Sequence, residues 1–296
     1  MNTKTYLRWI PPISFAVAGV VIAWGLTVLL TQPVTRWFAT SATLWMAFLL
    51  VSVLSNLRRR SFIALSAAAL GTAVVGRLFS VLRLGAAATP AGTSVSDLDL
   101  FVATGPGITG FGYLALLLGA LLFAQFVLTA IEDVLSSAAD QETRLRTWAL
   151  TFIRIYVGLM FVPHVGGHLF GGPAQFAIYT QYFGVLGMPF PSVGLGMAGA
   201  VEFVSALGLV LGLCTRPVAL LAATYLLISM WLGGHFTIGY VWALPDGGYE
   251  FGVFWAVIVA VFTVVGGGPL SVDNGVRQGN FQNRWPRLRA ARFLFL

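Results

Sequence analysis

The fifth apolar segment of this sequence carries residues that could bind a small polar ligand or exchange protons with it. Residues three or four positions apart there are Arg154, Gly158, Phe161, His164 and His168. At about 100° per residue of an α-helix, they occupy one face about 120° wide. Because a polar face inside a membrane span should turn toward other helices or a cavity, this spacing predicts that the side chains point into the protein.

A carboxylate, Glu202, lies near the middle of the next apolar segment. At that depth it must pair with a cation, take up a proton or reach water. Arg154 could reach it from one end of the bundle and His164 from the other. Small residues share its helix face at four-residue spacing, which would let a neighbouring helix approach closely; they are Gly194, Ala198 and Ala206. Three interpretations are open: an ion pair that only fixes helix register, a pocket for a small redox-active or acidic ligand, and a proton path.

The three histidines also raise the question of a metal site. His164 and His168 would share one helix face, and His235 ends the seventh apolar segment on the same predicted side. Imidazole nitrogens are common metal ligands. No cysteine-rich, Met-rich or further carboxylate motif accompanies them, so we assign no metal ligand. The alternative is histidines with ordinary hydrogen bonds or at the membrane interface.

The composition indicates that a membrane-spanning scaffold positions these residues. Of the 296 residues, 58% are hydrophobic and 9% are charged, whereas soluble domains carry about 25% charged residues. We therefore predict an all-α polytopic membrane protein with about eight transmembrane helices in two four-helix halves. The apolar runs of spanning length are 13–30, 41–57, 61–82, 107–131, 148–170, 193–213, 217–235 and 251–265.

The net charge of +7 could suggest nucleic acid as a partner, but the positions of the charges argue against it. All basic residues except Lys4 are arginines, and most lie in short segments between apolar runs. Basic loops stay cytoplasmic, and here alternate segments are basic, so both termini are predicted to be cytoplasmic. The basic tail, residues 276–296, should meet anionic lipid at the inner leaflet.

One polar stretch divides the predicted helices into two groups. Segment 132–147 is the only sizeable break in hydrophobicity. It separates a predicted N-terminal four-helix membrane module (1–140) from a second four-helix bundle (141–275).

Two longer segments are predicted on the outer side. Residues 84–106 are rich in Gly, Thr and Ser and hold Asp97 and Asp99, which predicts an extracytoplasmic loop. Residues 171–192 are aromatic and uncharged. That pattern fits either a short helix in the membrane interface or a loop with aromatic anchors.

Residues about 145–275 resemble the DoxX family of four-span membrane proteins. The resemblance rests on the Arg-x-x-x-Gly-x-x-Phe-x-x-His stripe, on Glu202, and on motif residues at Gly187, Pro189, Gly212, Thr215, Arg216, Gly248, Glu250, Ser271 and Asp273. The family usually continues His-Gly-x-x-Lys, whereas this chain has Val165 after the histidine and His168 at the lysine position. A role that needs this lysine does not carry over. The first half is only faintly similar to related four-span modules, mainly through Gly76-Arg77-Leu78.

The resemblance implies a four-helix bundle and a redox-linked role in a bacterial inner membrane. With the polar stripe, it leads to the hypothesis of a quinone-associated subunit. Glu202 and His164 would exchange the protons of the head group, and Arg154 would stabilise its anionic form. The remaining stripe residues would line the cofactor site; they are Gly158, Phe161 and His168.

Cys214 is the single cysteine, which excludes an intrachain disulfide, a dithiol redox pair and an iron–sulfur cluster bound within this chain. Electrons would therefore come directly from substrate or from a partner. An enzyme of this kind would be a quinone-linked oxidoreductase subunit. The alternatives are a non-catalytic accessory or assembly subunit of a larger membrane protein complex, and a small-molecule carrier.

Overall fold

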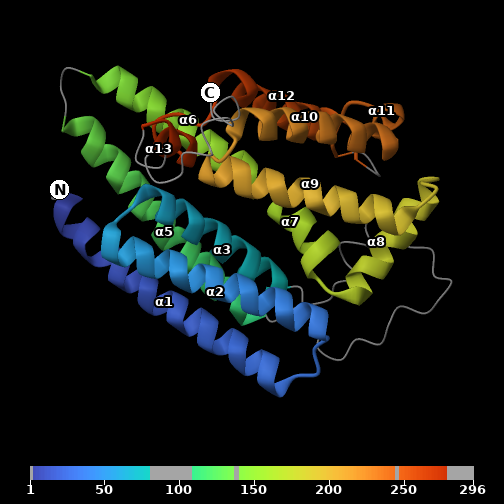
Figure 1. The fold of residues 1–296 in the computed structure, drawn as a ribbon, viewed down its shortest axis with the longest axis horizontal. Coiled ribbons are helices and arrows are strands. Elements are labelled where there is room, and N and C mark those ends of the chain that lie inside the picture. Colours follow the sequence, from blue (N-terminus) through green and yellow to red (C-terminus); the bar gives the residue numbers. More distant parts are fainter. Residues whose placement is uncertain (1–2, 81–108, 137–139, 244–246, 279–296) are drawn as a thin grey trace. The chain divides into compact units, whose positions relative to one another are not determined.

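The computed structural model describes residues 3–80, 109–136, 140–243 and 247–278. All regular secondary structure in these ranges is helical, as Figure 1 shows. The predicted all-α fold is confirmed. In chain order the helices are α1 (Thr3–Thr31), α2 (Arg36–Arg59), α3 (Phe62–Ser80), α5 (Thr109–Leu135), α6 (Gln141–Leu159), α7 (Val162–Val165), the π-helix η1 (Gly166–Phe170), α8 (Pro173–Val185), α9 (Pro191–Leu211), α10 (Thr215–Leu232), α11 (His235–Ile238), α12 (Glu250–Val265) and α13 (Val272–Arg277).

Seven stretches of the described chain are helical, long and apolar enough to cross a membrane. They match the first seven predicted spans. The eighth, α12, is apolar but has only 16 residues, or about 24 Å at 1.5 Å per residue, against about 30 Å of hydrocarbon. The sidedness of the helices stays a prediction.

The chain forms two compact units. The first contains Met1–Ala149 and Val165–Tyr179, and the second contains Leu150–His164 and Thr180–Leu296. The predicted domain limits at residues 140 and 275 stay predictions. The predicted outer loop 84–106 and nearly all of the basic tail lie outside the described residues.

Four long helices surround the core of the first unit. α1 packs against α2 and α5, and α3 also packs against α2 and α5, which closes a ring of four. Phe79 stacks on Phe111 inside it, with ring centroids 4.5 Å apart. Two buried amides, Asn56 on α2 and Gln125 on α5, exchange hydrogen bonds of 2.9 and 3.0 Å. Because both amides are satisfied by each other, they can lie in the apolar core at low cost.

In the second unit, α10 packs against both α9 and α12. The turn between α9 and α10 is tight, because Gly212 adopts the left-handed conformation (φ +67°) that ends α9. Asp273 closes the start of α10, since its two carboxylate oxygens accept the backbone N–H groups of Cys214 at 2.7 Å and Thr215 at 2.8 Å. The first turn of α13 (Val272–Arg277) thereby fixes the end of α9 and the start of α10.

The aromatic segment 171–192 contains a helix. α8 covers 13 of its residues and buries none of their side chains. Of the two open interpretations, the structure favours the short helix over the extended loop. Its aromatic side chains are half-buried, so part of each ring is left to meet the membrane interface that the sequence predicted.

Candidate functional site

The fifth predicted span is not one regular helix. α6 ends before Phe161, whose N–H bonds the carbonyl oxygen of Gly158 three residues back, at 3.2 Å. The π-helix η1 then widens the turn. Because both irregularities change the angle per residue, the predicted single face does not extend from Arg154 to His168. Arg154 and His164 belong to the second unit, whereas His168 belongs to the first.

Arg154 holds the C-terminal end of α9. Its side chain is 1% exposed, and its guanidinium donates to the carbonyl oxygens of Leu209, Val210 (3.2 Å) and Leu270 (2.8 Å). The last carbonyls of a helix lack partners within that helix and attract a cation. Arg154 therefore neutralises this helix end and ties it to the loop after α12.

Glu202 is not the partner of Arg154. It lies on α9 seven residues before Leu209, which is about 10.5 Å along the axis. The ion pair of these two side chains, one of the interpretations that the sequence left open, is not formed, because the arginine reaches the end of α9 instead of its middle.

Gly158 and Phe161 are packing residues in this structure. A Cβ atom on Gly158 would lie 2.9 Å from the side chains of Leu209 and Val210, so glycine permits the close approach of α6 to α9. Phe161 is fully buried against Trp255 of α12, with ring centroids 4.5 Å apart. Trp255 also donates from Nε1 to the carbonyl oxygen of Val157 at 3.3 Å. These contacts account for both residues by packing, and their predicted cofactor role stays a prediction.

The buried carboxylate of Glu202 has a partner that the sequence did not indicate. Tyr225 of α10 donates its hydroxyl to Glu202 Oε1 at 2.5 Å. Glu202 is 1% exposed, whereas Tyr225 is half-buried. The pair therefore joins a fully buried carboxylate on α9 to a half-buried tyrosine on α10.

A second polar group lies next to this pair. Ser205 follows Glu202 by three residues, so both side chains lie on the same side of α9. Its hydroxyl is fully buried, and Oγ has no hydrogen-bond partner among the described residues. Glu202, Ser205 and Tyr225 thus form a small polar cluster inside an apolar bundle.

The histidines lie in different surroundings. His164 is exposed, with its ring 5.9 Å from that of Trp255. His168 is buried and meets Tyr179 edge-on at 4.5 Å. His235 Nδ1 lies 2.8 Å from the carbonyl oxygen of Gly247. Within the described ranges no group of three or more His, Cys, Asp or Glu side chains is placed to hold a metal ion.

The motif residues around the turn between α9 and α10 converge. Asp273 accepts the N–H groups at the start of α10, and its own N–H donates to the carbonyl oxygen of Gly212 at 2.9 Å. Burial, followed by the charge of Asp273, raises the pKa of the Cys214 thiol in this turn. The Ser-x-Asp motif near the C-terminus therefore acts as a brace for the helix turn around Gly212.

Part of the second half of the chain matches a known protein family. Residues 149–235 match the DoxX family. They form a DoxX family domain. The matched part includes the polar stripe, Glu202 and Tyr225. The Ser-x-Asp brace at 271–273 lies outside it, although the sequence resemblance was expected to extend to about residue 275. Comparisons with curated proteins and with solved structures gave no match.

Tyr225 is the site residue that the sequence analysis missed. The available signal was a tyrosine near the middle of the span 217–235, where its hydroxyl needs a partner. The sequence could not name that partner, because it does not fix the rotation of α10 relative to α9.

Proposed function

We propose that the DoxX domain is the proton-handling part of a quinone-associated redox subunit in a bacterial inner membrane. The observation that supports the proposal is the buried pair of Glu202 and Tyr225. A carboxylate inside an apolar bundle is costly, and one that is hydrogen-bonded to a phenol at 2.5 Å can give up or receive a proton along that bond.

The donor set fits a quinone head group. A bound quinone supplies two-electron chemistry coupled to two protons, and its carbonyl oxygens accept hydrogen bonds. The buried hydroxyl of Ser205 lacks a partner among the described residues and is available as a donor. Ser205 and the protonated carboxyl of Glu202 would hold the carbonyl oxygens.

Tyr225 would connect this site to the surface of the domain. Its hydroxyl donates to Glu202 Oε1, so a proton taken from Glu202 can be replaced through the phenol. Arg154 acts at a distance from this chemistry. Because its guanidinium is bound to backbone carbonyls, we assign it the positioning of α9 and no contact with the head group.

The test uses the full chain, purified in mild detergent. Extracted lipids are analysed by mass spectrometry for quinone, and binding of a short-chain water-soluble quinone is titrated by tryptophan fluorescence. Loss of one hydrogen bond between neutral groups costs about 0.5–1.5 kcal/mol. We therefore expect Glu202→Gln and Ser205→Ala each to weaken binding about two- to tenfold.

Tyr225→Phe removes one hydroxyl from the cluster, and Tyr156→Phe is its matched control. Tyr156 is an exposed tyrosine on α6 of the same domain. We expect Tyr225→Phe to slow the proton uptake that accompanies reduction of the bound quinone by added dithionite, and Tyr156→Phe to leave it unchanged. Absence of co-purified quinone together with no saturable fluorescence change would refute the proposal.

A second candidate, a non-catalytic accessory subunit, is favoured by a different observation. Arg154, Gly158 and Phe161 are all used in packing, so much of the stripe serves the bundle itself. In this case the protein would migrate with a larger complex in native gels. Glu202→Gln and Tyr225→Phe would then leave the activity of that complex unchanged.

A further inference from the structure

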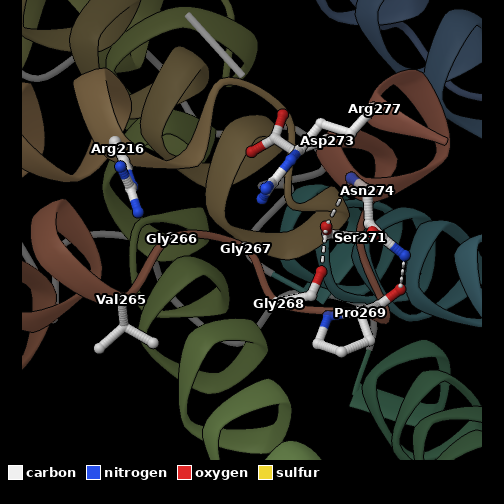
Figure 2. Close-up of a pocket in the computed structure, with 10 residues that line it drawn as sticks. All are labelled: Arg216, Val265, Gly266, Gly267, Gly268, Pro269, Ser271, Asp273, Asn274 and Arg277. Atoms are coloured by element: carbon white, nitrogen blue, oxygen red, sulfur yellow. Dashed lines mark hydrogen bonds between the residues drawn. The ribbon is translucent and has the colours of Figure 1, made fainter. Parts of the chain in front are cut away.

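A pocket of about 160 Å³ lies where α12 ends (Figure 2). Its lining includes no residue of the Glu202 cluster. A water molecule occupies roughly 30 Å³ in the liquid, so the space admits a larger group. The walls come from three segments of the second unit. They are the first turn of α10, the glycine-rich loop 266–269 and the helix α13.

The pocket carries two arginines. Arg216 comes from α10 and Arg277 from α13, and both side chains are exposed. Neither forms an ion pair with any residue in the described ranges. Asp273 is the only acidic residue in the lining, and both of its oxygens already accept backbone N–H groups at the start of α10. The charges of the lining therefore sum to a net positive value.

The glycine-rich loop has a fixed shape. Gly266 and Gly268 have φ angles of +75° and +70°, which residues other than glycine rarely adopt. Ser271 Oγ donates to the carbonyl oxygen of Gly268 at 2.5 Å, and Asn274 Nδ2 donates to that of Pro269 at 2.9 Å. Figure 2 shows both bonds below the two arginines.

The same loop offers free backbone donors. Within the described chain, no hydrogen bond occupies the N–H groups of Gly267 or Gly268. A Cβ atom on Gly268 would meet nothing within 4 Å, so there is open space beside it. Gly268 is exposed, whereas Gly267 is buried. Unpaired N–H groups of a glycine loop, next to arginines, are suited to an anion with several acceptor oxygens.

We propose that this pocket binds a phosphate group, held between Arg216 and Arg277 over the glycine-rich loop. The planar guanidinium matches phosphate oxygens with two parallel hydrogen bonds. The phosphate can belong to a phospholipid head group, because the pocket lies at the end of an apolar helix, or it can be free in solution. The site is independent of the quinone proposal and involves none of its residues.

In the experiment the full chain in detergent is titrated with three probes, and binding is detected by native mass spectrometry. Phosphatidylglycerol has the phosphate and the acyl chains, diacylglycerol has only the chains, and inorganic phosphate has only the anion. We expect saturable binding of phosphatidylglycerol and none of diacylglycerol. Binding of inorganic phosphate without phosphatidylglycerol would also support the site and would identify free phosphate as its ligand.

Arg216→Gln and Arg277→Gln should each weaken binding about tenfold or more, since each removes charged hydrogen bonds. Arg146→Gln is the matched control, because Arg146 is an exposed arginine on α6 outside the pocket. Arg216→Lys keeps the charge and loses the planar guanidinium, so this variant should bind the phosphate probe less tightly than wild type does. It provides the test if a glutamine variant fails to fold. The proposal is overturned if neither phosphate probe binds, or if the double glutamine variant binds as wild type does.

Discussion

Arg154 and Glu202 should contribute independently to the stability of the DoxX domain. The guanidinium of Arg154 reaches Leu209 and Val210, so about 10.5 Å of helix separates it from Glu202. The Glu202 side chain also leans toward the start of α9, away from the arginine. Changes more than 7–10 Å apart without shared partners usually add within about 0.3–0.5 kcal/mol. We therefore expect a coupling energy below about 0.5 kcal/mol between Arg154→Met and Glu202→Gln.

The single change Arg154→Met should itself be large. Three backbone carbonyls lose their donor, and each hydrogen bond to a charged group contributes about 1.5–3 kcal/mol. Since such losses are not additive, we expect at least about 3 kcal/mol of lost unfolding free energy. Arg146→Met is the control. Arg146 forms an exposed pair with Glu142, and such pairs contribute at most about 1 kcal/mol.

In the assay, the full chain is unfolded in mixed micelles that contain an increasing fraction of sodium dodecyl sulfate. Tryptophan fluorescence reports the unfolding. The free energy of unfolding is measured for wild type, for both single variants and for the double variant, which together form a double-mutant cycle. A coupling energy of about 2 kcal/mol or more would refute the reasoning, because it would require direct contact between Arg154 and Glu202. If Arg154→Met fails to fold, Arg154→Lys gives the same cycle with a smaller perturbation.

Three further predictions follow from contacts elsewhere in the protein. Gly158→Ala should lower thermal stability, because overpacking costs about 1–3 kcal/mol. Gly196→Ala, where a Cβ atom meets nothing within 4 Å, should raise it or leave it unchanged, and equal effects of the two would contradict the packing role. Burial and a nearby carboxylate raise the pKa of Cys214, so its thiol stays protonated at neutral pH and should react with iodoacetamide more slowly than free cysteine. The rate should rise with pH through the alkaline range, and a rate equal to that of free cysteine at pH 7.5 would count against the shift. Asn56→Leu should destabilise the first unit by leaving the buried amide of Gln125 without its partner, at about 1–3 kcal/mol. The double change with Gln125→Leu should recover part of the loss in the same unfolding assay, and strict additivity would exclude the reciprocal pair.

The position of Arg154 shows where sequence patterns stop being informative. Its spacing from Gly158 correctly indicates a residue that faces the protein interior. The side chain is long enough to reach several groups, and the choice among them depends on where α9 ends. That end is set by Gly212 and by the contact of Asp273, 61 residues further along the chain. A helical face can be inferred from spacing, but a contact over that separation cannot.

Glu202 illustrates the complementary case. The sequence identifies it as an energetically costly charged residue within an apolar helix, and the structure confirms its burial. Its partner Tyr225 was not identified, because the hydroxyl reaches the carboxylate only at one rotation of α10 about its axis. The π-helix η1 was missed for a similar reason. Hydropathy does not register a change from α to π, although that change separates His168 from the other stripe residues.

The sequence by itself determined that this is an all-helical membrane protein. It predicted eight spans, and seven of them are helices long and apolar enough to cross the bilayer in the described chain. That information is local, because each span must satisfy its own backbone hydrogen bonds and present an apolar surface to lipid. Tertiary structure alone decided which polar groups meet. Arg154 caps α9, Tyr225 donates to Glu202, and two arginines from separate helices line one pocket. Such pairings depend on helix rotation and on contacts between distant segments, which the order of residues along one helix does not specify.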